Sequence, residues 1–149
     1  MKIFKLFFCT ILILTIFNTL KSAEQIDPIK VDWSFKGLLG KFDRASLQRG
    51  YQVYKEVCAS CHSMQYLSYR NLGEPGGPEL SKQEVKAIAA SVEITDGPDD
   101  QGEMFTRPGR PADKFKNPYP NVKASIAANG GAYPPDMSVL VKARPGGSN

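Results

Sequence analysis

The feature that most constrains this chain is the segment Val-Cys-Ala-Ser-Cys-His at residues 57–62, in which two cysteines lie three positions apart and a histidine follows. This spacing is the attachment pattern of c-type haem. Cys58 and Cys61 lie about one helical turn apart on the same side of the backbone, so both thiols can add to neighbouring vinyl groups of one porphyrin. His62 can then give an imidazole nitrogen to the iron. The segment therefore predicts covalent haem attachment through Cys58 and Cys61, with His62 as a metal ligand.

Three other uses of a cysteine pair fit this chain less well. A thioredoxin-type dithiol needs its first cysteine at a helix N-terminus, whereas the helix predicted before Cys58 ends at the motif. A structural zinc site usually takes two separated pairs of ligands, and His62 is the only histidine. A disulfide would close a very short loop and leave His62 without a role. The dithiol oxidoreductase alternative can be tested by measuring whether the protein reduces insulin.

Residues 1–23 have the pattern of an export signal, since Lys2 and Lys5 precede an apolar run at residues 6–17 that is followed by small residues. The run is shorter than the roughly 20 apolar residues of a membrane span. We expect the signal to be cleaved, with retention as an uncleaved anchor as the alternative. Residues 24–149 are then one domain outside the cytoplasm.

The charge balance gives no argument for a nucleic-acid partner. The chain has 19 Lys and Arg against 15 Asp and Glu, a net charge of +4. Three of the lysines lie in residues 1–23, so the remainder carries 16 positive against 15 negative side chains, a net charge of 16 − 15 = +1. A domain so close to neutrality has no overall basicity that would point to such a partner.

Capping residues and apolar periodicity predict three helices. The first is capped by Asp43 and runs to Cys58. The second begins with a capping box at Ser81 and ends near residues 93–97. The third is a short helix of small residues that Asn121 caps and an Asn-Gly-Gly sequence ends.

The segments between these helices are rich in proline and glycine and are expected to be loops. Residues 107–120 carry four prolines and should be irregular. Residues 96–103 form an acidic turn, either a solvated loop or a docking patch for a basic protein. Residues 24–41 should form an extended arm whose apolar side chains pack along the domain or against a partner, namely Trp33, Phe35, Leu38, Leu39 and, just beyond it, Phe42.

Several segments, taken in order, make the haem motif more specific. They are Trp-Ser-Phe-Lys-Gly at 33–37, Leu-Gln-Arg-Gly-Tyr-Gln-Val-Tyr-Lys-Glu-Val-Cys at 47–58, Tyr-Arg at 69–70, Asp-Gly-Pro at 96–98, Gly-Glu-Met at 102–104, Arg-Pro-Gly at 107–109, Asn-Pro-Tyr-Pro-Asn at 117–121, Ala-Asn-Gly-Gly-Ala at 128–132 and Pro-Pro-Asp at 134–136. Together they closely resemble the cytochrome c1 family, the haem subunits of the quinol:cytochrome c oxidoreductase (cytochrome bc1) complex. The resemblance covers residues 31–147.

The resemblance implies an all-α, class I cytochrome c-like haem domain with long irregular Pro/Gly-rich loops. Such a subunit sits in a membrane complex with cytochrome b and faces the bacterial periplasm or the mitochondrial intermembrane space. It takes an electron from the Rieske iron-sulfur protein and passes it to a soluble cytochrome c. It is an electron carrier, because no bond in a substrate is made or broken.

The resemblance also gives roles to individual residues. Cys58 and Cys61 are the thioether positions of haem c, and His62 is the proximal ligand. Arg144 matches the arginine that meets a haem propionate, a sensible pairing of guanidinium and carboxylate; an exposed surface arginine is the alternative. The segment lining the haem face is matched by Pro134 and Pro135. The acidic turn gains weight as a docking surface for a basic cytochrome c.

This sequence departs from the family at its C-terminal side. The family continues further and supplies a methionine for the sixth iron position and a transmembrane helix. Met64 lies too close to His62 to reach the opposite haem face, and Met104 and Met137 are at positions that the family does not use. We therefore expect a fragment or truncated product, incomplete at the C-terminus, whose haem is five-coordinate or takes a substitute ligand. The alternative function is a truncated haem-binding product with an open iron site and no productive electron transfer.

Covalent attachment gives the first testable prediction. The exported protein should show the pyridine haemochrome spectrum of c-type haem, because thioether bonds alter the porphyrin vinyl groups. The same bonds should keep the haem on the protein during acid-acetone extraction. Haem that leaves the protein in acid acetone would contradict attachment through Cys58 and Cys61.

Overall fold

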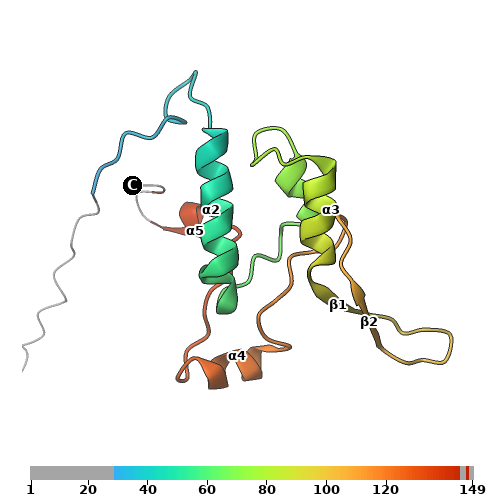
Figure 1. Ribbon diagram of the computed structural model, residues 1–149. Helices are drawn as coiled ribbons and strands as arrows, with labels where there is room; N and C mark the ends of the chain where they lie inside the picture. Colours follow the sequence, from blue (N-terminus) through green and yellow to red (C-terminus); the bar gives the residue numbers. More distant parts are fainter. Residues whose placement is uncertain (1–28, 145–146, 148–149) are drawn as a thin grey trace, which may run out of the picture. The chain divides into compact units, whose positions relative to one another are not determined.

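The computed structural model describes residues 29–144 and residue 147 (Figure 1). The predicted export signal at residues 1–23 lies outside the described residues. The elements all belong to the unit that begins at Val31. In chain order they are the helix α2 (Arg44–Glu56), the 3-10 turns η1 (Cys58–Ser60) and η2 (Tyr69–Gly73), the helix α3 (Lys82–Ala90), the strands β1 (Glu93–Asp96) and β2 (Phe105–Pro108), and the helices α4 (Val122–Ala128) and α5 (Leu140–Ala143).

The helix α2 begins as predicted at Asp43, whose carboxylate accepts hydrogen bonds from Ser46 N at 2.7 Å and Ser46 Oγ at 2.6 Å. The helix ends at Glu56, so the prediction that it continues to Cys58 is wrong by two residues. Val57, which is β-branched, has φ −121° and leaves the helical region. The chain then tightens into η1, which carries the first cysteine.

The helix α3 begins with the predicted capping box. Ser81 Oγ accepts from Glu84 N at 3.3 Å, and the Glu84 carboxylate accepts from Ser81 N at 2.8 Å. The helix ends at Ala90, earlier than the predicted end near residues 93–97. Residues 93–96 instead form β1, because they pair with a second strand further along the chain.

A two-stranded antiparallel sheet makes the fold different from the all-α prediction. In it β1 pairs with β2, with Glu93 opposite Pro108 and Asp96 opposite Phe105. The pairing residues include Ile94, which belongs to the β-branched and aromatic types that favour strands. The prediction of irregular backbone over residues 107–120 is therefore wrong at its first two residues, and Pro108 is tolerated because it ends an edge strand.

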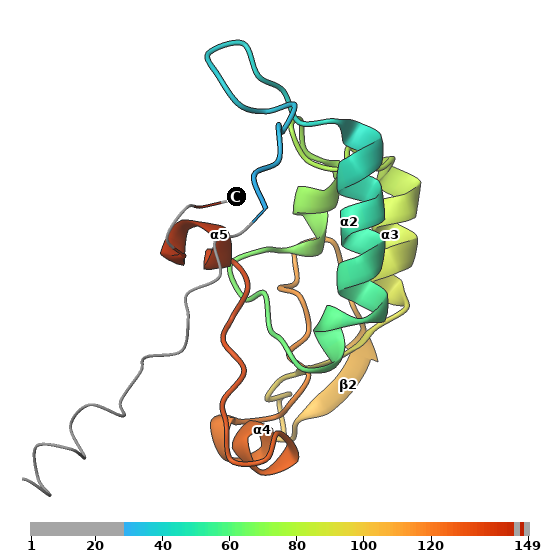
Figure 2. The same cartoon turned by 90° about the vertical axis from the view of Figure 1, so that its left-hand side faces the viewer.

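The short helix α4, labelled in Figure 2, begins and ends where the sequence predicts. Asn121 caps it, and the side-chain oxygen of Asn121 accepts from Ala124 N at 2.9 Å, as predicted. The helix ends at Ala128, and Gly130 and Gly131 follow with φ values of +62° and +91°. This left-handed backbone is readily adopted by glycine and turns the chain away from the helix.

The core gathers around the ring of Phe115. This ring lies 4.9 Å from that of Tyr69, 5.9 Å from that of Tyr54 and 6.1 Å from that of Tyr51, measured between centroids. Among residues 29–144 and 147, the buried hydrophobic residues are Tyr54, Tyr69, Leu72, Val85, Ala89 and Phe115. They join α2, η2 and α3 to the proline-rich segment that carries Phe115.

The arm before α2 carries an aromatic cluster of its own. The Phe35 ring lies 5.7 Å from that of Trp33 and 4.6 Å from that of Phe42, so these three side chains pack on one another. Leu38 and Leu39 are 101% and 90% exposed, so neither packs along the domain, and packing of the arm against a partner stays a prediction. In the part of the chain that the structure describes, no helix has the length and apolar character to cross a bilayer.

A largely buried arginine ties the sheet to the loop that follows it. Arg107 Nε donates to Asp96 at 2.5 Å, and the two terminal nitrogens of Arg107 donate to the two oxygens of Asp113 at 2.7 and 2.9 Å. The carboxylate of Asp113 also accepts from Arg110 N at 2.7 Å. These bonds, led by those from Arg107, lower the pKa of Asp113 to about 2.

Gly109 provides a test of the contact between the sheet and α3. A Cβ atom at Gly109 would lie 2.5 Å from the carbonyl oxygen of Ala89, which is fully buried, whereas a Cβ at Gly50 in α2 would meet no atom within 4 Å. Gly109→Ala should lower the free energy of unfolding by about 1–3 kcal/mol. Gly50→Ala, the matched control, should raise it by about 0.5–1 kcal/mol. Urea denaturation followed by circular dichroism measures both, and equal effects would contradict the contact.

Asp113 provides a test of the ion pair through pH. Its pKa is about 2 in the folded protein against 3.8 for the ordinary group, so its stabilising effect is complete above about pH 5 and is lost towards pH 2. Asp113→Asn should therefore destabilise the protein at neutral pH, and its difference from wild type should narrow as the pH falls. Asp100→Asn is the control, because the exposed Asp100 side chain makes no hydrogen bond to a described residue. Urea midpoints across this range decide, and a pH-independent difference for Asp113→Asn would refute the prediction.

Candidate functional site

The two cysteines of the motif belong to one tight turn. The carbonyl oxygen of Cys58 accepts from Cys61 N at 3.1 Å and from His62 N at 2.9 Å. Ser60 Oγ donates to the carbonyl of Val57 at 2.7 Å, which closes the same turn from outside. Both thiols are half-buried and form no disulfide. Local hydrogen bonds therefore set the spacing of the two sulfurs, and both sulfurs remain able to react.

The imidazole of His62 is oriented by a distant residue. His62 Nδ1 lies 2.8 Å from the carbonyl oxygen of Pro135. A carbonyl oxygen can only accept, so Nδ1 carries the hydrogen, and in the neutral form of the ring the lone pair is then on Nε2. Histidines that bind metals commonly donate their other ring N–H to such a carbonyl. The arrangement leaves Nε2 as the atom that can bind iron.

The carbonyl of Pro135 is brought to His62 by a set of hydrogen bonds between residues 63–66 and residues 135–138, which we call the join. Met137 N donates to the Ser63 carbonyl at 2.9 Å, and Tyr66 N donates to Ser138 Oγ at 3.1 Å. The structure thus brings the predicted site residue Pro135 to the motif through its backbone. No local sequence pattern predicts this contact, because the partners are 73 positions apart.

Asp136 lies inside the join and is ionised at neutral pH. Burial raises the pKa of this carboxyl, but hydrogen bonds from Ser138, Gln65 and Ser63 together outweigh burial and bring the pKa to about 2. A negative charge is therefore held next to Pro135 in the chain. Asp136 was not predicted as a site residue, although it belongs to the Pro-Pro-Asp sequence that resembles the family.

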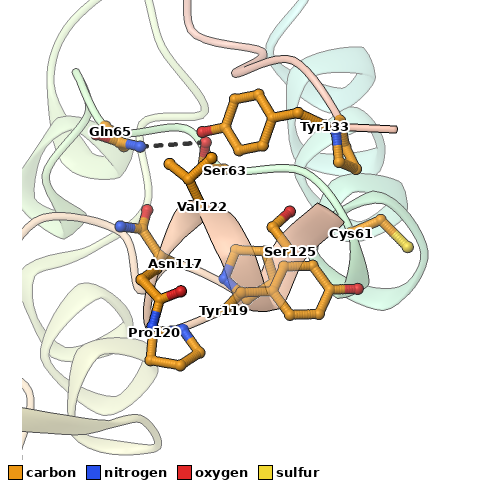
Figure 3. A pocket seen from close by; sticks show the side chains of 12 residues that line it. Cys61, Ser63, Gln65, Asn117, Tyr119, Pro120, Val122, Ser125 and Tyr133 are labelled. Carbon is orange, nitrogen blue, oxygen red and sulfur yellow. Dashed lines mark hydrogen bonds between the residues drawn. The ribbon is translucent and has the colours of Figure 1, made fainter. Parts of the chain in front are cut away.

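A pocket of about 100 Å³ adjoins the motif (Figure 3). Cys61 and Pro134 line it, as two of the predicted site residues. Tyr119, Ser125 and Tyr133 line it as well and were not predicted as site residues. Ser125 is 4% exposed, so α4 approaches the pocket closely, which agrees with the small side chains of that helix.

Arg144 is not brought to the motif by any contact in the structure. It follows α5 directly, it is exposed, and its side chain makes no hydrogen bond or ion pair with a described residue. The predicted pairing of Arg144 with a propionate therefore stays a prediction.

The methionines occupy different environments. Met64 and Met137 are partly buried and pack against the core around Phe115, whereas Met104 is 60% exposed. Among the described residues, no three or more His, Cys, Asp and Glu side chains gather where they could hold a metal ion.

Residues 33–149 match the model of the Cytochrome C1 family. The chain belongs to this family. Proteins of the cytochrome c1 family carry covalently bound haem c, and Cys58 and Cys61 stand at its two attachment positions in this chain. The half-buried, unbridged thiols on one turn, with a bare histidine nitrogen beside them, fit this group.

Individual relatives agree with the family model. The chain is 61% identical over 112 residues to cytochrome b/c1 of Bradyrhizobium diazoefficiens, covering 75% of this chain and 16% of the relative. It is 50% identical over 137 residues to the mitochondrial haem protein cytochrome c1-2 of Solanum tuberosum, covering 89% and 52%. It is 55% identical over 120 residues to cytochrome c1 of Rhodospirillum rubrum, covering 80% and 43%. The chain thus spans about half or less of the length of these relatives.

Proposed function

We propose that this chain is the haem-bearing, electron-transfer part of a cytochrome c1 subunit in a quinol:cytochrome c oxidoreductase. The observation that carries the proposal is the histidine beside the cysteine pair, since the hydrogen bond from His62 Nδ1 to Pro135 leaves Nε2 for iron. Membership of the cytochrome c1 family supports the same conclusion. The domain has the class I cytochrome c-like arrangement, with the two-stranded sheet as an addition.

The roles within the site follow from the chemistry of each residue. Cys58 and Cys61 hold the porphyrin through thioether bonds, and His62 is the proximal iron ligand. Pro134 and Pro135 line the haem face, where rings without a backbone N–H leave no unpaired donor against the porphyrin. Arg144 pairs with a haem propionate, which suits a guanidinium that makes no other ion pair among the described residues.

The haem supplies a one-electron redox couple, and the protein supplies its orientation and surroundings. The subunit takes its electron from the Rieske iron-sulfur protein and passes it to a soluble cytochrome c, within a complex that contains cytochrome b. The name of the Bradyrhizobium relative, cytochrome b/c1, supports the association with cytochrome b. Residues 1–23 export the domain, residues 24–149, to the periplasmic face of the inner membrane or to its mitochondrial equivalent.

The loop at residues 96–103 is the docking surface for a basic cytochrome c in this proposal. Asp99, Asp100 and Glu103 are exposed there, and such a surface steers an oppositely charged partner. The loop has a defined shape, because Asp99 Oδ1 accepts from Gln101 N and from Glu103 N at 2.9 Å each.

Complementation tests the function. This chain, expressed with its export signal in a strain that lacks its own cytochrome c1, should restore quinol:cytochrome c reductase activity in isolated membranes. His62→Ala should reduce that activity to background, because it removes the iron ligand but keeps both thioether positions. Haem staining of the membranes confirms that both proteins are loaded.

The outcomes separate this proposal from its alternative. A chain that is loaded with haem and assembled in the complex but gives no turnover would be the haem-binding product with an open iron site. Full activity in His62→Ala would contradict the role of His62. Arg144→Gln, which removes the charge at similar length, should leave haem attachment intact.

A further inference from the structure

We propose that Asp136 is the positioning residue of the proximal histidine. Its carboxylate, by accepting hydrogen bonds from the turn that follows the haem motif, holds the Pro135 carbonyl on His62 Nδ1 and so fixes the direction of Nε2. The inference rests on the proposed role of His62 as the iron ligand.

The contacts of Asp136 span the join. Asp136 Oδ2 accepts from Ser63 Oγ at 2.8 Å and from Gln65 N at 2.9 Å, and both donors lie just after His62. The other oxygen, Oδ1, accepts from Ser138 N at 2.8 Å. One carboxylate therefore ties the turn after the motif to the segment that carries Pro135.

The two residues before Asp136 explain why the segment is anchored by a side chain. Pro134 and Pro135 have no backbone N–H, so neither residue can donate a hydrogen bond that anchors the segment. The Pro135 carbonyl belongs to the peptide plane that Pro135 shares with Asp136, and a hold on Asp136 restricts the rotation of that plane. On the C-terminal side of Asp136, Met137 N donates to the Ser63 carbonyl at 2.9 Å and anchors the segment there as well.

Burial gives these contacts their weight. Ser63 is 6% exposed, and its hydroxyl donates to Asp136. Removing the carboxylate would leave this buried hydroxyl without its charged acceptor, which costs more than losing an exposed bond. The join should then loosen first at Asp136, and the hydrogen bond to His62 Nδ1 should loosen with it.

A weaker hydrogen bond to His62 Nδ1 should change the reduction potential of the haem. A histidine that donates Nδ1–H to a fixed acceptor is a stronger electron donor, which stabilises ferric iron. Weakening the bond to Pro135 should therefore raise the reduction potential of the haem and speed the exchange of the Nδ1 proton with water.

The test uses the haem-loaded chain with cyanide added to the ferric protein, so that the sixth ligand is the same in every variant. NMR measures exchange of the His62 Nδ1 proton, and redox titration without cyanide measures the potential. Asp136→Asn keeps the size but replaces one acceptor oxygen with an NH₂ group. It should speed proton exchange about tenfold or more and shift the potential upwards. Asp136→Glu, which keeps the charge, should restore part of both values.

Asp99→Asn is the matched control, because Asp99 also accepts two backbone N–H bonds but lies in the loop at residues 96–103. It should change neither measurement. Ser63→Ala removes one donor to Asp136 and should give a smaller change in the same direction, which also serves if Asp136→Asn does not accumulate.

The inference would be overturned if Asp136→Asn had the same Nδ1 proton exchange rate and the same haem reduction potential as the wild type. Where only Ser63→Ala accumulates, the same result in that variant would overturn it. A wild-type chain whose haem shows no histidine resonance would instead refute the proposed haem ligation. The two failures are therefore distinguishable.

Discussion

The join between residues 63–66 and 135–138 is the constraint on which the candidate site depends. Its hydrogen bonds connect residues that are 71 to 74 positions apart. Closing a flexible loop of that length costs about 4 kcal/mol of chain entropy, whereas a hydrogen bond contributes about 1 kcal/mol, and more when it is made to a charge. The bonds of the join therefore roughly offset the closure and leave little surplus.

The aromatic core lowers the chain entropy cost of forming the join. Phe115 N donates to the Leu67 carbonyl at 3.1 Å, and Tyr69 N donates to the Asp113 carbonyl at 3.1 Å, so residue 115 is already fixed close to the motif. The open stretch before the join is then about 20 residues, and closing it costs about 1 kcal/mol less than closing the whole loop. The packing of Phe115 on its tyrosine neighbours thus shortens the loop that must close to bring Pro135 to His62.

The sequence predicted those parts of the fold and site that depend on local chemistry. Asp43, Ser81 and Asn121 bond to N–H groups within three residues, and each begins a helix where predicted. The cysteine spacing is equally local. The sheet was not predicted, because the proline-rich composition after residue 105 indicated irregular backbone. The strand there forms only by pairing with Glu93–Asp96. The hydrogen bond of Pro135 and the role of Asp136 depend on contacts over more than 70 positions, which no local pattern encodes.

The turn at Cys58–Ser60 and the join differ in contact order, and this difference separates two steps in making the site. The turn closes through partners no more than four residues apart, so it can form in an otherwise unfolded chain on the timescale of a single turn. The orientation of His62 waits for contacts at a separation of 73 residues. The spacing of the two sulfurs is thus set before the orientation of the imidazole. In the proposed function, a partly folded chain would therefore be able to attach its porphyrin before His62 Nε2 is positioned to bind the iron.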